Sequence, residues 1–160
     1  MAVATPAVDV LVRRGIAYRL HEYTHDSAAS YGREAVEAVG TEPNRVFKTL
    51  VAAAPGRLAV AVIPVSTELD LKAMADAIGV KKVTMAEPAE AERATGYVIG
   101  GISPLGQRRR LLTVVDESAS QWPTVFVSGG RRGLELELAP ADLVTLTGAL
   151  VASVARARKR

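Results

Sequence analysis

Residues 46–64, VFKTLVAAAPGRLAVAVIP, decide the fold of this chain. Two apolar runs, 46–54 and 58–64, flank the turn residues Pro55 and Gly56. This pattern predicts a β-hairpin of two largely buried strands. A hairpin among irregularly mixed strands and helices fits an α+β domain better than a doubly wound one.

On both sides of the hairpin, helical and strand patterns follow one another without a repeating unit. The whole chain, 1–160, is therefore expected to form a single α+β domain, with a mixed, largely antiparallel, barrel-like sheet flanked by helices. A basic tail, 155–160, is expected to fray. The expected helices are 5–15, 31–39, 68–78, 87–94 and 140–154, and the further strands are 17–23, 82–85, 97–99, 111–115, 124–127 and 134–138.

Composition excludes several kinds of site. The chain has no cysteine and only two histidines, so a disulfide, a thiolate zinc site, a cysteine nucleophile and a multi-histidine metal site are not expected. We expect neither a metal nor a cofactor. Asp9, Arg13 and Arg14 interrupt the first apolar stretch, and no run approaches the roughly 18 apolar residues of a membrane span. We therefore expect a cytoplasmic protein without a membrane partner.

Positive charge is clustered, although the net charge is only +3. The clusters lie at 81–82, 108–110, 131–132 and 156–160. Each could be a solvated turn, but together they favour a phosphate-bearing partner such as nucleic acid. Aromatic residues make up 4% of the chain, which argues against a surface that stacks a run of single-stranded bases. DNA is not expected as a partner.

A glycine-rich stretch, 95–106, carries four glycines and one proline directly after a β-branched run. Such a loop allows backbone to approach a ligand closely and to direct N–H groups at an oxyanion. The alternative is an ordinary tight turn. The spacing of Gly96, Gly100 and Gly101 does not match the dinucleotide-binding fingerprint.

Lys48 and Glu135 are the ionisable residues with the most unusual surroundings. Lys48 shares a strand face with Val46 and Leu50, so it must snorkel to solvent, bind an anion or lower its pKa. Glu135 and Glu137 share the strand face opposite three leucines. That face is either solvated, or it places Glu135 beside a cationic substrate group such as an α-amine.

The two histidines lie near Tyr23. His21 shares a strand face with Tyr23, and His25 follows in a polar loop. A catalytic histidine needs an orienting partner and a nucleophile, and the sequence identifies neither. A structural role is favoured for both.

Six motifs, in this order and over 5–154, closely resemble the YbaK/EbsC family, and most strongly its cysteinyl-tRNA(Pro) deacylase branch. They are Thr5-Pro6-Ala7, His21-Glu22-Tyr23-Thr24-His25-Asp26, Val46-Phe47-Lys48-Thr49-Leu50, Leu69-Asp70-Leu71-Lys72, Thr95-Gly96-Tyr97 with Gly106-Gln107, and Val127-Ser128-Gly129-Gly130-Arg131-Arg132-Gly133-Leu134.

The resemblance implies the aminoacyl-tRNA editing fold and a trans-editing hydrolase, related to the editing insertion domain of bacterial prolyl-tRNA synthetases. Its substrates would be Cys-tRNA(Pro) and Cys-tRNA(Cys), with prolyl-tRNA synthetase as a further partner. The family resemblance also suggests that the cysteine thiol of the substrate attacks its own ester. Two alternatives stay open: a deacylase of Ala-tRNA(Pro) or another aminoacyl-tRNA that uses water, and a non-catalytic module that binds tRNA or a synthetase.

The resemblance also assigns candidate residues. The family's acidic residue after the second glycine turn is usually aspartate, and Glu135 stands here with one methylene more. Candidate catalytic residues are Lys48, Gly100 and Gly101; candidate substrate-binding residues are Tyr23, Ile102, Ser103, Ser128, Gly129 and Glu135. The basic clusters beside the two glycine loops supply the candidate tRNA contacts Arg108, Arg109, Arg131 and Arg132.

Overall fold

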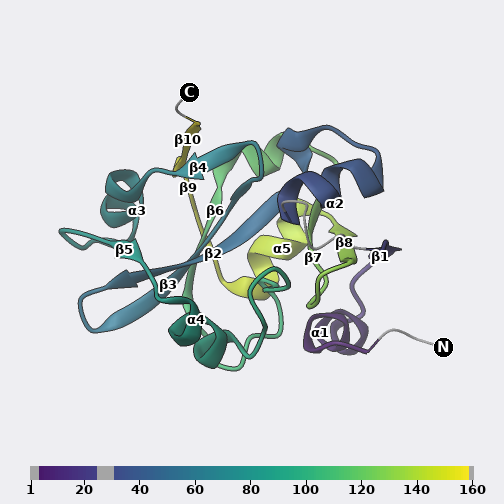
Figure 1. Ribbon diagram of the computed structural model, residues 1–160, viewed down its shortest axis with the longest axis horizontal. Coiled ribbons are helices and arrows are strands. Elements are labelled where there is room, and N and C mark those ends of the chain that lie inside the picture. Colours follow the sequence, from purple (N-terminus) through teal and green to yellow (C-terminus); the bar gives the residue numbers. More distant parts are fainter. Residues whose placement is uncertain (1–3, 25–30, 159–160) are drawn as a thin grey trace.

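The predicted hairpin lies at the centre of the molecule (Figure 1). The computed structural model describes residues 4–24 and 31–158. Strands β2 (Phe47–Ala54) and β3 (Arg57–Pro64) pair antiparallel along their full length, from Phe47 opposite Pro64 to Ala54 opposite Arg57. The prediction of a hairpin over this stretch is therefore confirmed.

The hairpin belongs to a five-stranded sheet with the order β5-β2-β3-β6-β9. Strand β5 (Thr84–Met85) pairs antiparallel with β2, whereas β6 (Leu112–Asp116) and β9 (Leu150–Ala152) continue the sheet in parallel. Side chains of β3 alternate between two buried clusters, one on each face of this sheet. Burial on both faces explains why β3 reads as a continuous apolar run.

Two smaller sheets flank the large one. Strands β1 (Arg19–Glu22), β8 (Leu134–Leu138) and β7 (Val125–Ser128) form an antiparallel sheet, and β4 (Thr67–Leu69) pairs with β10 (Ala155–Ala157). A parallel bridge between Val46 and Phe126 joins β2 to the three-stranded sheet. The α+β class and the mixed sheet are confirmed. Within the described ranges, however, the strands form three separate sheets rather than a closed barrel.

Five helices and two 3₁₀ turns are described, and no described helix is long and apolar enough to cross a bilayer. Helix α1 is tied to the second glycine turn: the hydroxyl of its N-cap Thr5 accepts from the Val8 N–H and donates to the Gly129 carbonyl at 2.6 Å. The helices are α1 (Pro6–Arg14), α2 (Tyr31–Val39), α3 (Leu71–Ile78), α4 (Pro88–Thr95) and α5 (Pro140–Thr147), and the 3₁₀ turns are Pro43–Arg45 and Glu117–Gln121.

The C-terminal prediction is wrong. Helix α5 ends at Thr147 because Gly148 caps it with a φ of 65°, and β9 and β10 follow instead of further helix. The part of the basic tail in β10 does not fray. The Asp116 carboxylate accepts from the N–H groups of Val154 and Ala155, each at 3.0 Å, and β10 pairs with β4. Residues 159–160 lie outside the described part of the chain.

Two other boundaries also differ. No strand forms at 97–99, because Gly96 ends α4 and the chain turns so that the buried Tyr97 hydroxyl donates to the Leu105 carbonyl at 2.6 Å. Helix α3 begins at Leu71 rather than at Glu68, since the Asp70 side chain caps it, and the residues before it form β4.

Candidate functional site

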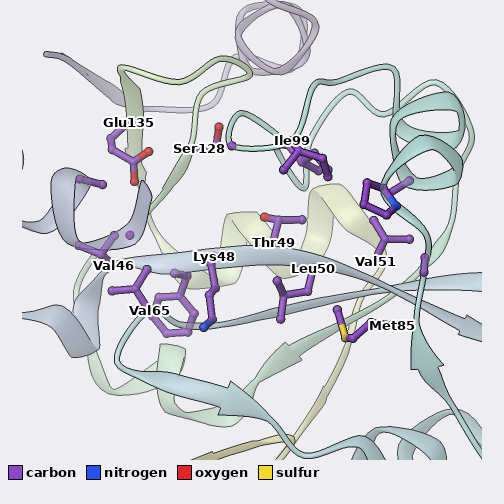
Figure 2. Close-up of a pocket in the computed structure, with 18 of the residues that line it drawn as sticks. Val46, Lys48, Thr49, Leu50, Val51, Val65, Met85, Ile99, Ser128 and Glu135 are labelled. Atoms are coloured by element: carbon purple, nitrogen blue, oxygen red, sulfur yellow. The ribbon is translucent and has the colours of Figure 1, made fainter. Parts of the chain in front are cut away.

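A cavity of about 310 Å³ lies along the edge of β2 that β3 does not cover (Figure 2). Strand β5 pairs with β2 at Ala52 and Ala53, and the Ala86 N–H donates to the Val51 carbonyl at 3.0 Å. In the described part of the chain, the edge of β2 is left uncovered between this contact and the bridge at Val46. Val46 and the first five residues of β2, 47–51, line the cavity. The remaining lining residues come from every neighbouring element: Tyr23, Gly32, Ala35, Val65, Met85, Ala86, Pro88, Ala91, Ile99, Gly100, Ile102, Ser128 and Glu135.

Lys48 is a half-buried cation in the wall of this cavity. Its Nζ donates to the Thr67 carbonyl at 2.7 Å. In Figure 2 the Lys48 side chain leaves one side of β2, whereas Ser128 and Glu135 lie on the other side. Burial lowers the pKa of Lys48; nearby Arg158 lowers it further, while Glu68 opposes the change. Simple snorkelling into solvent does not describe this residue, because its ammonium group is held against β4.

Glu135 is a buried carboxyl group that faces the cavity. It is 6% exposed and stands opposite Ser128 in the pairing of β7 with β8. Burial raises the pKa of Glu135 to about 8. The solvated-face interpretation is wrong for this residue, because Ala35 of α2 packs over the same side of the sheet with Val46, Val65 and Phe126.

Glu137, two residues further along β8, has ordinary partners instead. Its carboxylate accepts from the Thr124 hydroxyl at 2.6 Å and pairs with His21 at 2.9 Å and with Arg45 at 3.5 Å. Burial raises the pKa of Glu137, but the hydrogen bonds from Thr124 and His21 outweigh it and lower the pKa overall. His21 also contacts the ring of Phe126 edge-on, which fits the structural role expected for it. His25 lies outside the described residues.

Tyr23 and Glu135 form the polar end of the cavity. Burial, with a contribution from the Glu135 charge, raises the pKa of Tyr23 to about 12. The phenol therefore stays neutral near pH 7, so it offers a hydrogen bond and no charge. The result is a largely apolar cavity with a buried acid at one end and a lysine in its wall.

The two glycine loops touch each other. Gly100, with a φ of 92°, and Ile102 line the cavity, but Gly101 packs against the second loop. A Cβ atom added to Gly101 would lie 2.7 Å from the Arg131 Cα and 2.8 Å from the Arg132 nitrogen. The Gly101 N–H already donates to the Val98 carbonyl at 2.8 Å. Gly101 thus positions the loop, and of the two glycines it is Gly100 that lines the cavity.

Two of the predicted substrate-binding residues do not line the cavity. Ser103 is fully buried, and its Oγ accepts from the Leu105 N–H at 3.2 Å. Gly129 donates its N–H to the Leu134 carbonyl at 2.8 Å and accepts from Thr5. Both residues shape the loops, and direct binding of substrate by either is not supported by its position.

The predicted tRNA-binding arginines divide into two groups. Arg132 is committed to an ion pair with Glu34 at 3.2 Å, in which both side chains are largely buried, and Arg131 lies 3.5 Å from Glu22. Arg132 therefore has a structural partner, and its part in binding tRNA stays a prediction. Arg108 and Arg109 are exposed.

Sequence reasoning missed Thr49. Its Oγ1 is buried and has no hydrogen-bond partner among the described residues, and the residue lines the cavity. In Figure 2 its side chain lies on the same side of β2 as Ile99 and Ser128. A threonine in an apolar strand carries no signal of its own, so only the fold shows that its hydroxyl is unsatisfied. The apolar wall from Met85, Pro88 and Ala91 was missed for the same reason.

The buried acid predicts a pH-dependent stability. Because the folded-state pKa of Glu135 is about 8 and the ordinary value is 4.5, the folded protein holds one more proton between these values. The extra proton of the folded state raises the free energy of unfolding. This contribution is complete below pH 4.5 and is lost as the pH rises through about 8. The free energy of unfolding of wild type, relative to Glu135→Gln, should fall by roughly 1.4 kcal/mol per pH unit over this window. Parallel urea-denaturation curves from pH 5 to 8 measure it; a pH-independent difference contradicts it.

Comparisons with known proteins agree with this geometry. The family model for the aminoacyl-tRNA editing domain matches residues 25–146. A protein of Enterococcus faecalis with the provisional name Cys-tRNA(Pro)/Cys-tRNA(Cys) deacylase EbsC is 37% identical over 152 residues, which cover 94% of this chain and 92% of the relative.

Two solved structures also match over nearly their whole length. One, described as a candidate trans-editing enzyme for prolyl-tRNA synthetase, superposes with a TM-score of 0.85 at 27% identity, and the match covers 97% of this chain and 99% of that one. The other, described only as a hypothetical protein, gives a TM-score of 0.86 at 29% identity, with coverage of 95% and 100%.

Proposed function

This chain belongs to the aminoacyl-tRNA editing family, and we propose that it is a trans-editing deacylase that releases tRNA from Cys-tRNA(Pro) and Cys-tRNA(Cys). The observation that carries the proposal is Glu135, a buried acid that lines the cavity beside Tyr23. A buried acid is stabilised in its charged form by a cation close by. The α-ammonium group of an aminoacyl ester supplies that cation and binds at this end of the cavity.

The rest of the cavity suits the ester. With the amine beside Glu135, the ester carbonyl lies toward the glycine loop, where the Gly100 N–H binds the oxyanion of the tetrahedral intermediate. Lys48 adds positive potential along the path of the terminal ribose and its phosphate. The extra methylene of Glu135, compared with the aspartate usual in the family, brings the carboxyl further into the cavity and favours a small side chain on the substrate.

The nucleophile comes from the substrate. The chain has no cysteine, the Ser128 hydroxyl accepts from the Gly130 N–H, and the His21 Nε2 is bonded to Glu137 rather than to a serine. The cysteine thiolate attacks its own carbonyl carbon to form a C–S bond and an oxyanion. Collapse of the oxyanion breaks the C–O bond to the ribose, whose oxygen takes up the proton that the thiol lost. Holding the reactive rotamer gives this intramolecular step a high effective molarity, and water then opens the small thiolactone.

The protein's partners follow from this activity. The proposed contacts of Glu135, Gly100 and Lys48 are all with the aminoacyl end of the substrate. A second protein would therefore select the tRNA body, and we propose that it is prolyl-tRNA synthetase. Aminoacyl-tRNA is made and used in the cytoplasm, and we place the protein there.

The substrate series Cys, Ser and Ala on the same tRNA(Pro) tests the proposal. A thiol is partly ionised near neutral pH and is a far better nucleophile than a hydroxyl of similar size, so the cysteinyl ester should be cleaved at least roughly 10²-fold faster than the seryl ester. The alanyl ester should be nearly inert. Release of uncharged tRNA is followed on acid gels. If no ester releases tRNA faster than it does in buffer alone, the protein is a non-catalytic binding module. If the alanyl ester is cleaved fastest, the protein is a deacylase that uses water.

A further inference from the structure

A second cavity, of about 230 Å³, lies between α1, α5 and the far end of the glycine-rich loop. Arg14, Arg109 and Arg110 line it, and neither aspartate nor glutamate is among its described lining residues. All three arginines are exposed, and within the described part of the chain none of them forms an ion pair. Three like-charged arginines that line one concavity repel one another, and an anionic ligand bound there would relieve this repulsion.

The structure holds these arginines in place. Gly106, with a φ of 67°, packs so closely on α1 that a Cβ there would lie 2.5 Å from the Pro6 carbonyl carbon. This contact fixes the loop that precedes Arg109 and Arg110 against the helix that carries Arg14. The Arg110 guanidinium in turn packs against Gly148, where a Cβ would lie 2.7 Å from its Nη2. The last carbonyl groups of α5 also favour a cation at this position.

One loop separates the two cavities. Ile102 lines the first cavity and Pro104 lines the second. Two residues of chain span at most about 7 Å, so the two walls are adjacent. By distance alone, a polyanion whose end occupies the first cavity is long enough to place a nearby phosphate at the second cavity.

We propose that the second cavity binds a backbone phosphate of the tRNA whose aminoacyl end occupies the first cavity. This inference rests on the proposed function for its ligand. Guanidinium groups bind phosphate oxygens through short, charge-assisted and often bidentate hydrogen bonds, and the apolar floor from Leu105 and Leu146 covers the adjoining sugar. The contact supplies affinity for tRNA without reading its sequence.

The test is the double variant Arg14→Gln/Arg109→Gln, which leaves Arg110 on Gly148. It should weaken binding of uncharged tRNA by roughly tenfold, and the slope of log affinity against log salt should become shallower by about 0.7 for each lost contact. Arg19→Gln is the control for the loss of one exposed charge, because Arg19 is also exposed, lines neither cavity and forms no ion pair within the described part of the chain. It should change tRNA affinity less than twofold.

A second substrate separates this site from the catalytic one. Cysteinyl-adenosine, an ester without phosphates, should be cleaved by the double variant at the wild-type rate, whereas kcat/KM for Cys-tRNA(Pro) falls roughly tenfold. Unchanged tRNA affinity, an equal loss in Arg19→Gln, or equal losses on both esters would overturn the site. So would binding of ATP or inorganic phosphate that is lost in the double variant while tRNA affinity stays constant. If the wild-type protein cleaves neither ester, the proposed function is wrong. The tRNA affinities of the variants would then still show whether the second cavity binds tRNA.

Discussion

Replacing Lys48 by alanine is expected to lower the deacylation rate of Cys-tRNA(Pro) by roughly 10²-fold, the usual cost of removing one preorganised electrostatic group from an active site. Lys48 is a half-buried cation in the cavity wall, and its pKa is lowered chiefly by burial. The fold should survive, because the one hydrogen bond of its ammonium group that the structure records goes to the Thr67 carbonyl, which the paired β4 and β10 strands hold in place.

The matched control is Lys72→Ala, which removes the same charge from an exposed position on α3. It should leave the rate unchanged. Thermal unfolding of both variants checks the fold. Retention of more than about half the activity by Lys48→Ala would show that the lysine takes no part in catalysis.

Replacing Gly101 by alanine is expected to lower kcat by roughly 10²-fold while changing tRNA affinity little. The new Cβ would lie 2.7–2.9 Å from backbone atoms of Arg131 and Arg132. Backbone cannot move aside as a flexible side chain does, so the two glycine loops must separate and Gly100 must leave its place at the cavity. The phosphate site proposed at Arg14 and Arg109 does not include Gly101, so we expect most of the tRNA affinity to persist.

Gly79→Ala is the control for a general loss of stability. Gly79 has a φ of 77°, and a Cβ added to it would meet nothing within 4 Å. It caps the end of α3 and does not line the cavity. The substitution should lower the melting temperature without changing kcat. Equal losses of kcat and tRNA affinity in Gly101→Ala, together with a similar loss of stability, would indicate a structural defect instead.

The parts of the fold that could be predicted are those that local pattern determines. The hairpin was predictable because a turn pair separates two apolar runs, and helix α2 because Gly40 ends its periodic segment. For the segment 140–154 the local pattern predicted one long helix, and this prediction was wrong. Its apolar residues continue without a break in hydrophobicity, and a single glycine, Gly148, ends the helix before the strand β9.

The site was predictable in its motifs but not in its tertiary environment. Glu135 reads as one of two equivalent acids on a strand face, and only the packing of α2 makes it buried while Glu137 finds Arg45 and His21. Likewise, Arg132 reads as part of a basic cluster, but its partner Glu34 is 98 positions away. The convergence of Arg14 with Arg109 is also a product of the fold, which no local pattern contains.

The most direct measurement is product analysis of the Cys-tRNA(Pro) reaction in water enriched in ¹⁸O. If the cavity orients the ester and the substrate thiol attacks it, mass spectrometry of the rapidly quenched reaction should detect a cysteine thiolactone, or the adduct of an added amine that traps it. The thiolactone should carry no ¹⁸O, and the label should enter only when water opens the ring. Direct appearance of ¹⁸O-labelled cysteine, with no thiolactone or trapped adduct at any time, would show that water attacks the ester and would contradict the mechanism.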